Sequence, residues 1–174
     1  MAQQSASGEF TARPIRTDSP RKTFKSFLRL RGELEQTLRI YKLNKSWKLA
    51  EHKAVIYDQL VALLDLSLVP PASRREIGID TIAYLLDILG RIELPDIDSV
   101  PGEEAFEDDT KPARWRIPGT PIRIARMDSG SREGEFLFSD RTVRAAPRFY
   151  RGIEDLPLQS TLPITSWSLA LPQI

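Results

Sequence analysis

The densest group of side chains capable of chemistry is a run of eight carboxylates between residues 93 and 109, among which no Lys, Arg or His occurs. Carboxylates bind calcium when they alternate around a central glycine, and a suitably spaced pair can act as general acid and base. The spacing fits no EF-hand loop, and Asp108 and Asp109 are adjacent. The run therefore predicts a solvated acidic loop and no metal site. Its members are Glu93, Asp96, Asp98, Glu103, Glu104, Glu107, Asp108 and Asp109.

Histidine and cysteine chemistry is restricted by composition. The chain has no cysteine, which excludes disulfides, thiol catalysis and cysteine metal ligands. Its single histidine, His52, excludes zinc sites that need two imidazoles, and its neighbours Glu51 and Lys53 favour a solvated helix position. No glycine-rich phosphate loop is present, and no serine has a histidine partner in a known order. We predict no catalytic, cofactor-binding or metal-binding residues, and no enzyme activity.

Basic residues are concentrated in two parts of the chain. Residues 13–53 hold twelve Lys or Arg against four acids, and residues 111–151 hold ten against four. Such patches can bind nucleic acid or anionic lipid. However, Phe24, Phe27 and Tyr41 fall on an apolar helical stripe rather than among the basic residues, so the stacking platforms of a single-strand binder are missing. We expect no nucleic-acid partner, and pairing of the basic residues with the acidic loop.

Length and composition predict one globular domain. The chain has 174 residues, of which 41% are hydrophobic and 28% charged, with a net charge of +1. We assign residues 1–18 to a mobile arm, 19–155 to the domain and 156–174 to an extended, proline-containing tail. No apolar run reaches the 20 residues that span a bilayer, and the first residues lack the pattern of a secretory signal. Ala2 and Gln3 would suit the mature end of a processed secretory protein.

Three helices are predicted in the first half of the domain. Ser19 and Pro20 form a favourable start for the first, whose apolar stripe continues to Tyr41. The second is expected over 46–64, and Pro70 and Pro71 prevent its continuation. Ser73 and Glu76 match a capping box, which predicts a third helix from there to Gly90.

Strands and a short helix are predicted in the second half. Ile117, Ile122 and Ile124 flank a Pro-Gly-Thr-Pro turn, and polar turn residues at 128–131 lead to a further strand at 135–138, so a hairpin is expected. Within residues 134–150 a buried strand runs directly into a helix capped by Ser139, with Pro147 expected to kink or shorten it. The predicted fold class is therefore α+β: three N-terminal helices packed with a small antiparallel hairpin or sheet and a short C-terminal helix.

The order of these landmarks resembles one known arrangement. The landmarks are the Ser-Pro helix start at Ser19, the helix end LDLS at 64–67 with its two prolines, IEL at 92–94 before the acidic loop, IPGTPI at 117–122, and GEFLFS at 134–139 followed by Thr142-Val143 and Phe149-Tyr150. Together they resemble the soluble N-terminal, extracytoplasmic domain that precedes the membrane helices in some bacterial MscS-like small-conductance mechanosensitive ion channels. The likeness covers about residues 19–155.

The resemblance implies a regulatory or assembly domain on the periplasmic face of a bacterial membrane. The membrane part of the same polypeptide would form a homo-oligomeric pore that relieves osmotic stress. This chain lacks the pore helices and the cytoplasmic β domain, and its 43–47 turn is longer and more basic than is usual in the family. No site residue is carried over from the family. The alternative is a free-standing extracytoplasmic module that binds a small ligand between the helical layer and the hairpin.

Overall fold

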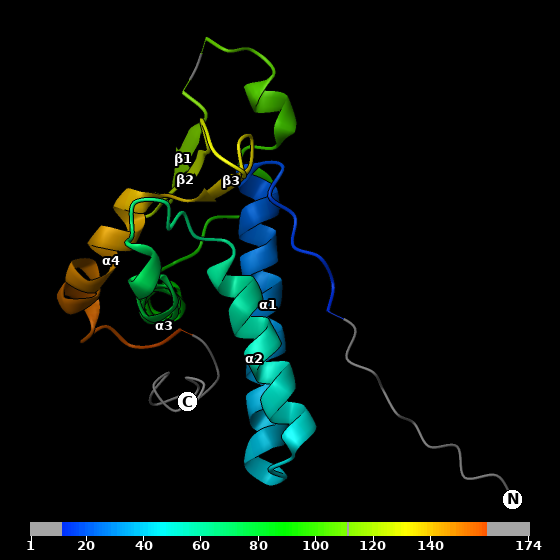
Figure 1. Cartoon of the computed structure of the whole chain (residues 1–174). Helices are drawn as coiled ribbons and strands as arrows, with labels where there is room; N and C mark the ends of the chain where they lie inside the picture. The colour runs from blue at the N-terminus through cyan, green and yellow to red at the C-terminus, as the bar shows by residue number, and fades with distance from the viewer. Residues whose placement is uncertain (1–11, 111, 160–174) are drawn as a thin grey trace, which may run out of the picture.

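The fold consists of a helical layer that packs on a small antiparallel sheet (Figure 1). The computed structural model describes residues 12–110 and 112–159. The predicted α+β class is confirmed. Within the described residues the elements are α1 (Pro20–Leu43), α2 (Trp47–Val61), η1 (Pro71–Ser73), α3 (Arg74–Arg91), η2 (Ile97–Ser99), η3 (Glu103–Phe106), β1 (Arg114–Arg116), β2 (Arg123–Arg126), β3 (Phe136–Phe138) and α4 (Asp140–Ile153).

The first helix begins as predicted. The Ser19 side chain accepts a hydrogen bond from the backbone N–H of Lys22, and Pro20 occupies the first helical position. Arg16 and Thr17, which the sequence assigns to the N-terminal arm, are hydrogen-bonded to the packed body. The N–H of Arg16 donates to Ser26 Oγ at 2.9 Å, and the carbonyl of Thr17 accepts from the N–H of Phe136 at 2.8 Å. Residues 1–11 of that arm lie outside the described residues.

The second helix packs along the first, and the two form an antiparallel hairpin (Figure 1). The Ser46 side chain accepts from the N–H of Leu49, so the helix begins where the sequence indicates. It ends at Val61, three residues earlier than expected. The following residues leave the helix because Leu64 forms a parallel bridge with Phe138 of β3. Long-range pairing therefore sets this helix end before the two prolines are reached.

The third helix is present, but its predicted cap is not. Ser73 has a helical backbone conformation and makes no capping hydrogen bond, since residues 71–73 form the short 3-10 helix η1 that leads directly into α3. A capping serine requires an extended backbone. Here the 3-10 turn begins at the prolines, Pro70 and Pro71, so Ser73 is already inside a helical turn. The helix continues one residue past Gly90, to Arg91.

The three strands form one sheet in the order β1-β2-β3, with both pairs antiparallel. The predicted turns connect them, and Gly119 and Gly130 supply positive φ angles of 75° and 88° at the turns. Strand β3 is buried at all three residues, as its apolar sequence indicates. The expected hairpin is therefore extended to three strands.

The last helix begins at the predicted cap and runs past its proline. The Ser139 side chain accepts from the N–H of Thr142. Pro147 does not shorten the helix, since α4 continues past it to Ile153. Val143 and Ala146 are buried and Tyr150 packs on Tyr84 of α3, with 5.4 Å between ring centroids. This packing holds the helix together where Pro147 removes one backbone hydrogen bond.

A substitution pair tests the close approach of α2 and α3. A Cβ atom on Gly78 would lie 2.8 Å from Cγ1 of Val61 and 3.2 Å from Cδ1 of Leu66. We expect Gly78→Ala to lower the free energy of unfolding by about 1–2 kcal/mol through overpacking. A Cβ atom added to Gly32 on α1 would have nothing within 4 Å. Gly32→Ala should therefore raise the free energy of unfolding by about 0.5–1 kcal/mol, because alanine has the higher helix propensity. Urea unfolding of both variants measures the difference, and effects of equal sign would contradict it.

Candidate functional site

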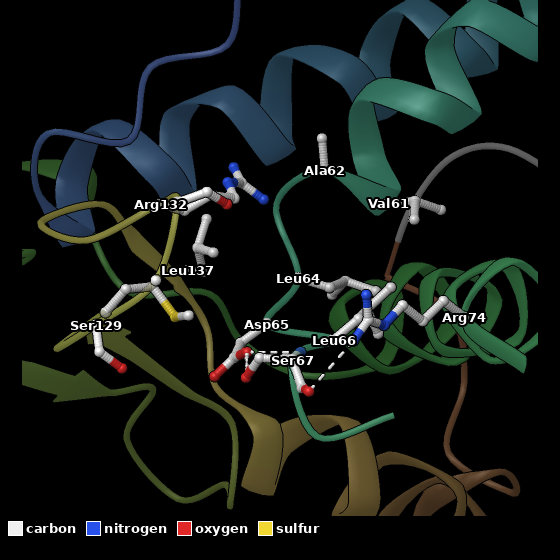
Figure 2. A pocket seen from close by; sticks show the side chains of 13 residues that line it. Val61, Ala62, Leu64, Asp65, Leu66, Ser67, Arg74, Ser129, Arg132 and Leu137 are labelled. Atoms are coloured by element: carbon white, nitrogen blue, oxygen red, sulfur yellow. Dashed lines mark hydrogen bonds between the residues drawn. The ribbon is translucent and has the colours of Figure 1, made fainter. Parts of the chain in front are cut away.

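A pocket lies between the helical layer and the hairpin formed by β2 and β3 (Figure 2). Its cavity volume is about 440 Å³, within the range of small-ligand sites. The walls come from the end of α2, the segment 64–67, the start of α3 and the turn 127–132. Its lining residues are Val61, Ala62, Leu64, Asp65, Leu66, Ser67, Arg74, Met127, Ser129, Gly130, Ser131, Arg132 and Leu137.

The base of the pocket is apolar and fixed by the fold. Leu64 and Leu137 are nearly fully buried, at 2% and 1% exposure. Backbone hydrogen bonds of neighbouring residues hold these two leucines in place. The N–H of Phe138 donates to the carbonyl of Leu63 at 2.9 Å, and the N–H of Asp65 donates to the carbonyl of Phe138 at 2.8 Å. These bonds join the end of the helical hairpin to the sheet and set the shape of the base.

Two arginines lie on opposite sides of the opening, as Figure 2 shows. Arg74 donates from Nε to the carbonyl of Val69 at 2.9 Å and from Nη2 to the carbonyl of Ser67 at 3.4 Å. Arg132 makes two hydrogen bonds to Glu135, at 2.7 and 3.1 Å. Both guanidinium groups are therefore held in place by the protein, and each still has donors available beyond these bonds.

The carboxylates near the pocket are also engaged. Asp65 Oδ1 accepts from the N–H and the hydroxyl of Ser67, at 3.0 and 2.6 Å. The bidentate hydrogen bond from Arg132 holds the pKa of Glu135 below its usual range, although burial opposes this, and the hydroxyl of Thr17 donates a further bond at 2.8 Å. Glu135 thus links the start of the described chain to the pocket turn. The site thus has an apolar base, and Arg74, which bonds to backbone carbonyls rather than to a carboxylate, is the rim group best placed to bind an anionic end of a ligand.

The pH dependence of stability should report on Glu135. Its folded pKa is lowered, so the unfolded chain takes up a proton first as the pH falls. The stabilisation is therefore complete above the ordinary value of 4.5 and is lost as the pH falls through the folded value. We expect Glu135→Gln to remove this part of the acid dependence in urea unfolding between pH 3 and 6. The exposed Glu133→Gln is the control, and an equal flattening in both variants would contradict the assignment.

The acidic loop lies apart from this pocket and packs on the start of α1. Lys22 forms an ion pair with Glu103, and Arg21 forms one with Glu104 at 3.8 Å. Arg21 Nε also donates to the carbonyl of Val100 at 2.8 Å. Some basic residues of the first half therefore pair with this loop, as the sequence suggests. Within residues 12–110 and 112–159, no group of three or more His, Asp or Glu is placed to hold a metal ion.

Two polar side chains of α2, Lys53 and Tyr57, are buried, and the sequence pattern anticipates only the second. Lys53 is 8% exposed and its ammonium group lies 5.3 Å from the centre of the Tyr41 ring, and desolvation lowers the pKa of this lysine. The Tyr57 hydroxyl is buried without a hydrogen-bond partner among the described residues. Burial raises the pKa of Tyr57. The apolar stripe of α2 predicts a buried Tyr57, whereas nothing in the pattern distinguishes Lys53 from exposed lysines. His52, expected at a solvated helix position, lies partly buried on α2.

Comparison with known proteins identifies no family for this chain. No family model, curated protein or solved structure matches the chain. Of the helices in the described part of the chain, none combines the length and the apolar character needed to cross a bilayer.

Proposed function

We propose that the chain is a non-catalytic, extracytoplasmic regulatory or assembly domain of an MscS-like mechanosensitive channel. In this proposal the pore belongs to the membrane part of the same polypeptide, outside the present sequence, and assembles as a homo-oligomer in a bacterial membrane. The domain would sit on the periplasmic face and modulate opening under osmotic stress. Its support is the sequence resemblance together with the way the resembling segments meet.

The single observation that favours the proposal is the junction at β3. The segments that carry the resemblance are far apart in sequence, yet Asp65 of one is hydrogen-bonded to Phe138 of another. Next to it, the N–H of Ser139 donates to the carbonyl of Arg123 at 2.9 Å, and Thr142 bonds to the backbone of the same residue. Hydrogen bonds between segments that carry the resemblance are the contacts that a shared fold would be expected to keep.

The junction also has a mechanical connection to the end of the described chain. Helix α4 starts at the junction and packs on α3. The residues after α4 return to the end of α3, where the N–H of Gln159 donates to the carbonyl of Gly90 at 2.7 Å and Arg91 bonds to the carbonyl of Leu156. In this proposal, these contacts through α4 are the route by which a shift of β3 would reach residue 159.

The test has a genetic and an electrophysiological part. The coding sequence past Ile174 should encode membrane-spanning helices. In patches from giant spheroplasts, deletion of residues 19–155 from that full-length protein should change the tension needed for opening. A natural stop directly after Ile174, or an unchanged opening tension with the deleted protein present at the same level in the membrane, would contradict the proposal.

A second candidate function, a free-standing extracytoplasmic ligand-binding module, is favoured by the pocket. The cavity lies between the helical layer and the hairpin, where the sequence-based alternative places a ligand. The apolar base and Arg74 favour a small amphipathic anion, for which decanoate is a suitable probe. A stop after Ile174 together with saturable decanoate binding would support this candidate over the channel domain.

Decanoate binding is measured by isothermal titration calorimetry. Ser129→Trp places a large ring on the pocket turn and should abolish binding, whereas Val55→Trp on the exposed face of α2, outside the pocket lining, should leave it unchanged. Binding that is absent in the original chain, or equal in both variants, would contradict a ligand site here.

A further inference from the structure

The free end of the α1–α2 hairpin projects beyond the rest of the fold (Figure 1). We call residues 39–48 the hairpin tip. The last buried core residues before and after it are Leu38 and Leu49, each 8% exposed. Helix α1 has 24 residues and so a length of about 36 Å, and its connecting turn lies at the end farthest from the sheet. The tip is therefore outside the core that stabilises the domain.

Large apolar side chains are exposed at this tip. Leu43 is 90% exposed and Trp47 is 78% exposed, and Ile40 one turn earlier is 44% exposed. The Trp47 ring is held by its own helix, because Nε1 donates to Glu51 Oε1 at 2.8 Å. Such exposure forfeits the free energy that burial of a Leu and a Trp would contribute to folding. The hairpin tip therefore carries three exposed apolar side chains.

The same end is strongly basic. Four cations lie on it, and no Asp or Glu occurs between Gln36 and Ala50. All four side chains are exposed, and none of them lies within 4 Å of a carboxylate in the described part of the chain. Arg21 and Lys22, at the other end of α1, are paired with the acidic loop instead. The basic residues of the tip are Arg39, Lys42, Lys45 and Lys48.

We propose that the hairpin tip docks on the surface of an anionic lipid bilayer. Trp and Leu are favourable at the depth of the lipid headgroups and the first acyl carbons, and Lys side chains reach back to the headgroup phosphates. Each Lys or Arg near an anionic surface adds to the attraction. Lys42, Lys45 and Lys48 are complementary to that surface, and Arg39, whose charge also acts on Glu35 one turn earlier, adds a fourth cation. The inference is independent of both functions proposed above, because it rests on exposure and charge at the tip alone.

Vesicle flotation of the 174-residue chain tests the charge requirement. We expect binding to equimolar phosphatidylglycerol and phosphatidylcholine, little binding to phosphatidylcholine alone, and loss of binding in 0.5 M salt. The triple variant Lys42→Gln, Lys45→Gln, Lys48→Gln should bind at least tenfold more weakly. A matched triple, Arg75→Gln, Arg141→Gln, Arg148→Gln, removes three exposed charges elsewhere and should stay within about twofold of the original chain. Equal losses in the two triples would overturn the proposal.

A second pair of variants tests whether the exposed apolar side chains of the tip are needed for binding to vesicles. Leu43→Ser with Trp47→Ser should also weaken binding at least tenfold, whereas Leu68→Ser, which changes an exposed leucine after α2, should not. Brominated lipids should quench the fluorescence of the original chain, and Trp47→Phe should remove that quenching. Sedimentation analysis provides the competing outcome: a dimer of the original chain that dissociates in the Leu43/Trp47 variant, without any vesicle binding, would assign the tip to self-association and overturn docking on lipid.

Discussion

Phe138→Ala is expected to lower the free energy of unfolding by about 3–5 kcal/mol, which is the usual cost of truncating a fully buried phenylalanine. Phe138 is fully buried and meets Phe27 of α1 edge to face, with 5.5 Å between ring centroids. Its backbone pairs with Ile124 of β2 on one side and with Leu64 on the other. The cavity would therefore open where helical layer, sheet and pocket base meet, and it has little freedom to collapse.

Urea unfolding followed by circular dichroism measures this loss. Phe106→Ala is the matched control, because Phe106 contacts Phe136 with 5.0 Å between ring centroids but lies partly exposed in the acidic loop. Its truncation should cost less than about 2 kcal/mol, since a partly exposed ring contributes less on burial. If the two variants lose the same stability, β3 is not the centre of the fold.

The elements that the sequence predicts well are those whose signals are local. Ser19, Ser46 and Ser139 each precede a helix and each caps it, because a side-chain hydroxyl beside an extended backbone needs no distant partner. The apolar run of β3 likewise predicts its burial. Ser73 shows the limit of such signals. Its pattern matches a capping box, but two prolines impose a turn that changes its backbone conformation and removes the cap.

The candidate site depends on contacts that no local pattern contains. The pocket exists because residues 61–67 and 127–132 come together, and the bonds from Leu63 and Asp65 to Phe138 that bring them together span more than 70 positions. A general location between helices and hairpin can be inferred from the order of elements, whereas the two arginines of the rim cannot. The hairpin tip is intermediate. Its charges are visible in the sequence, but only the fold shows that, in the described part of the chain, no carboxylate lies within 4 Å of them.

Thr142→Val should be the second most damaging of these substitutions, with an expected loss of about 2–3 kcal/mol. Thr142 is 1% exposed, and its hydroxyl accepts from the N–H of Arg123 at 2.8 Å while lying 3.1 Å from the carbonyl of the same residue. It also lies 3.1 Å from Ser139 Oγ, the cap of α4. Valine fills the same space without an oxygen, so the Arg123 N–H loses its acceptor. The sheet then keeps the bond from the Ser139 N–H to the Arg123 carbonyl but loses both contacts of the Thr142 hydroxyl.

Thr142→Ser distinguishes the contribution of the hydroxyl hydrogen bonds from that of the packed methyl group. Serine keeps the oxygen and loses the methyl group, so a loss of about 1 kcal/mol or less is expected in the same urea titration. If valine is tolerated and serine is not, the methyl group holds α4 in place and the hydrogen bonds contribute little. The expected order matters for function as well. In the channel proposal, α4 is the element that passes a shift of β3 to residue 159, and a helix with fewer hydrogen bonds to the sheet would pass that shift on less completely.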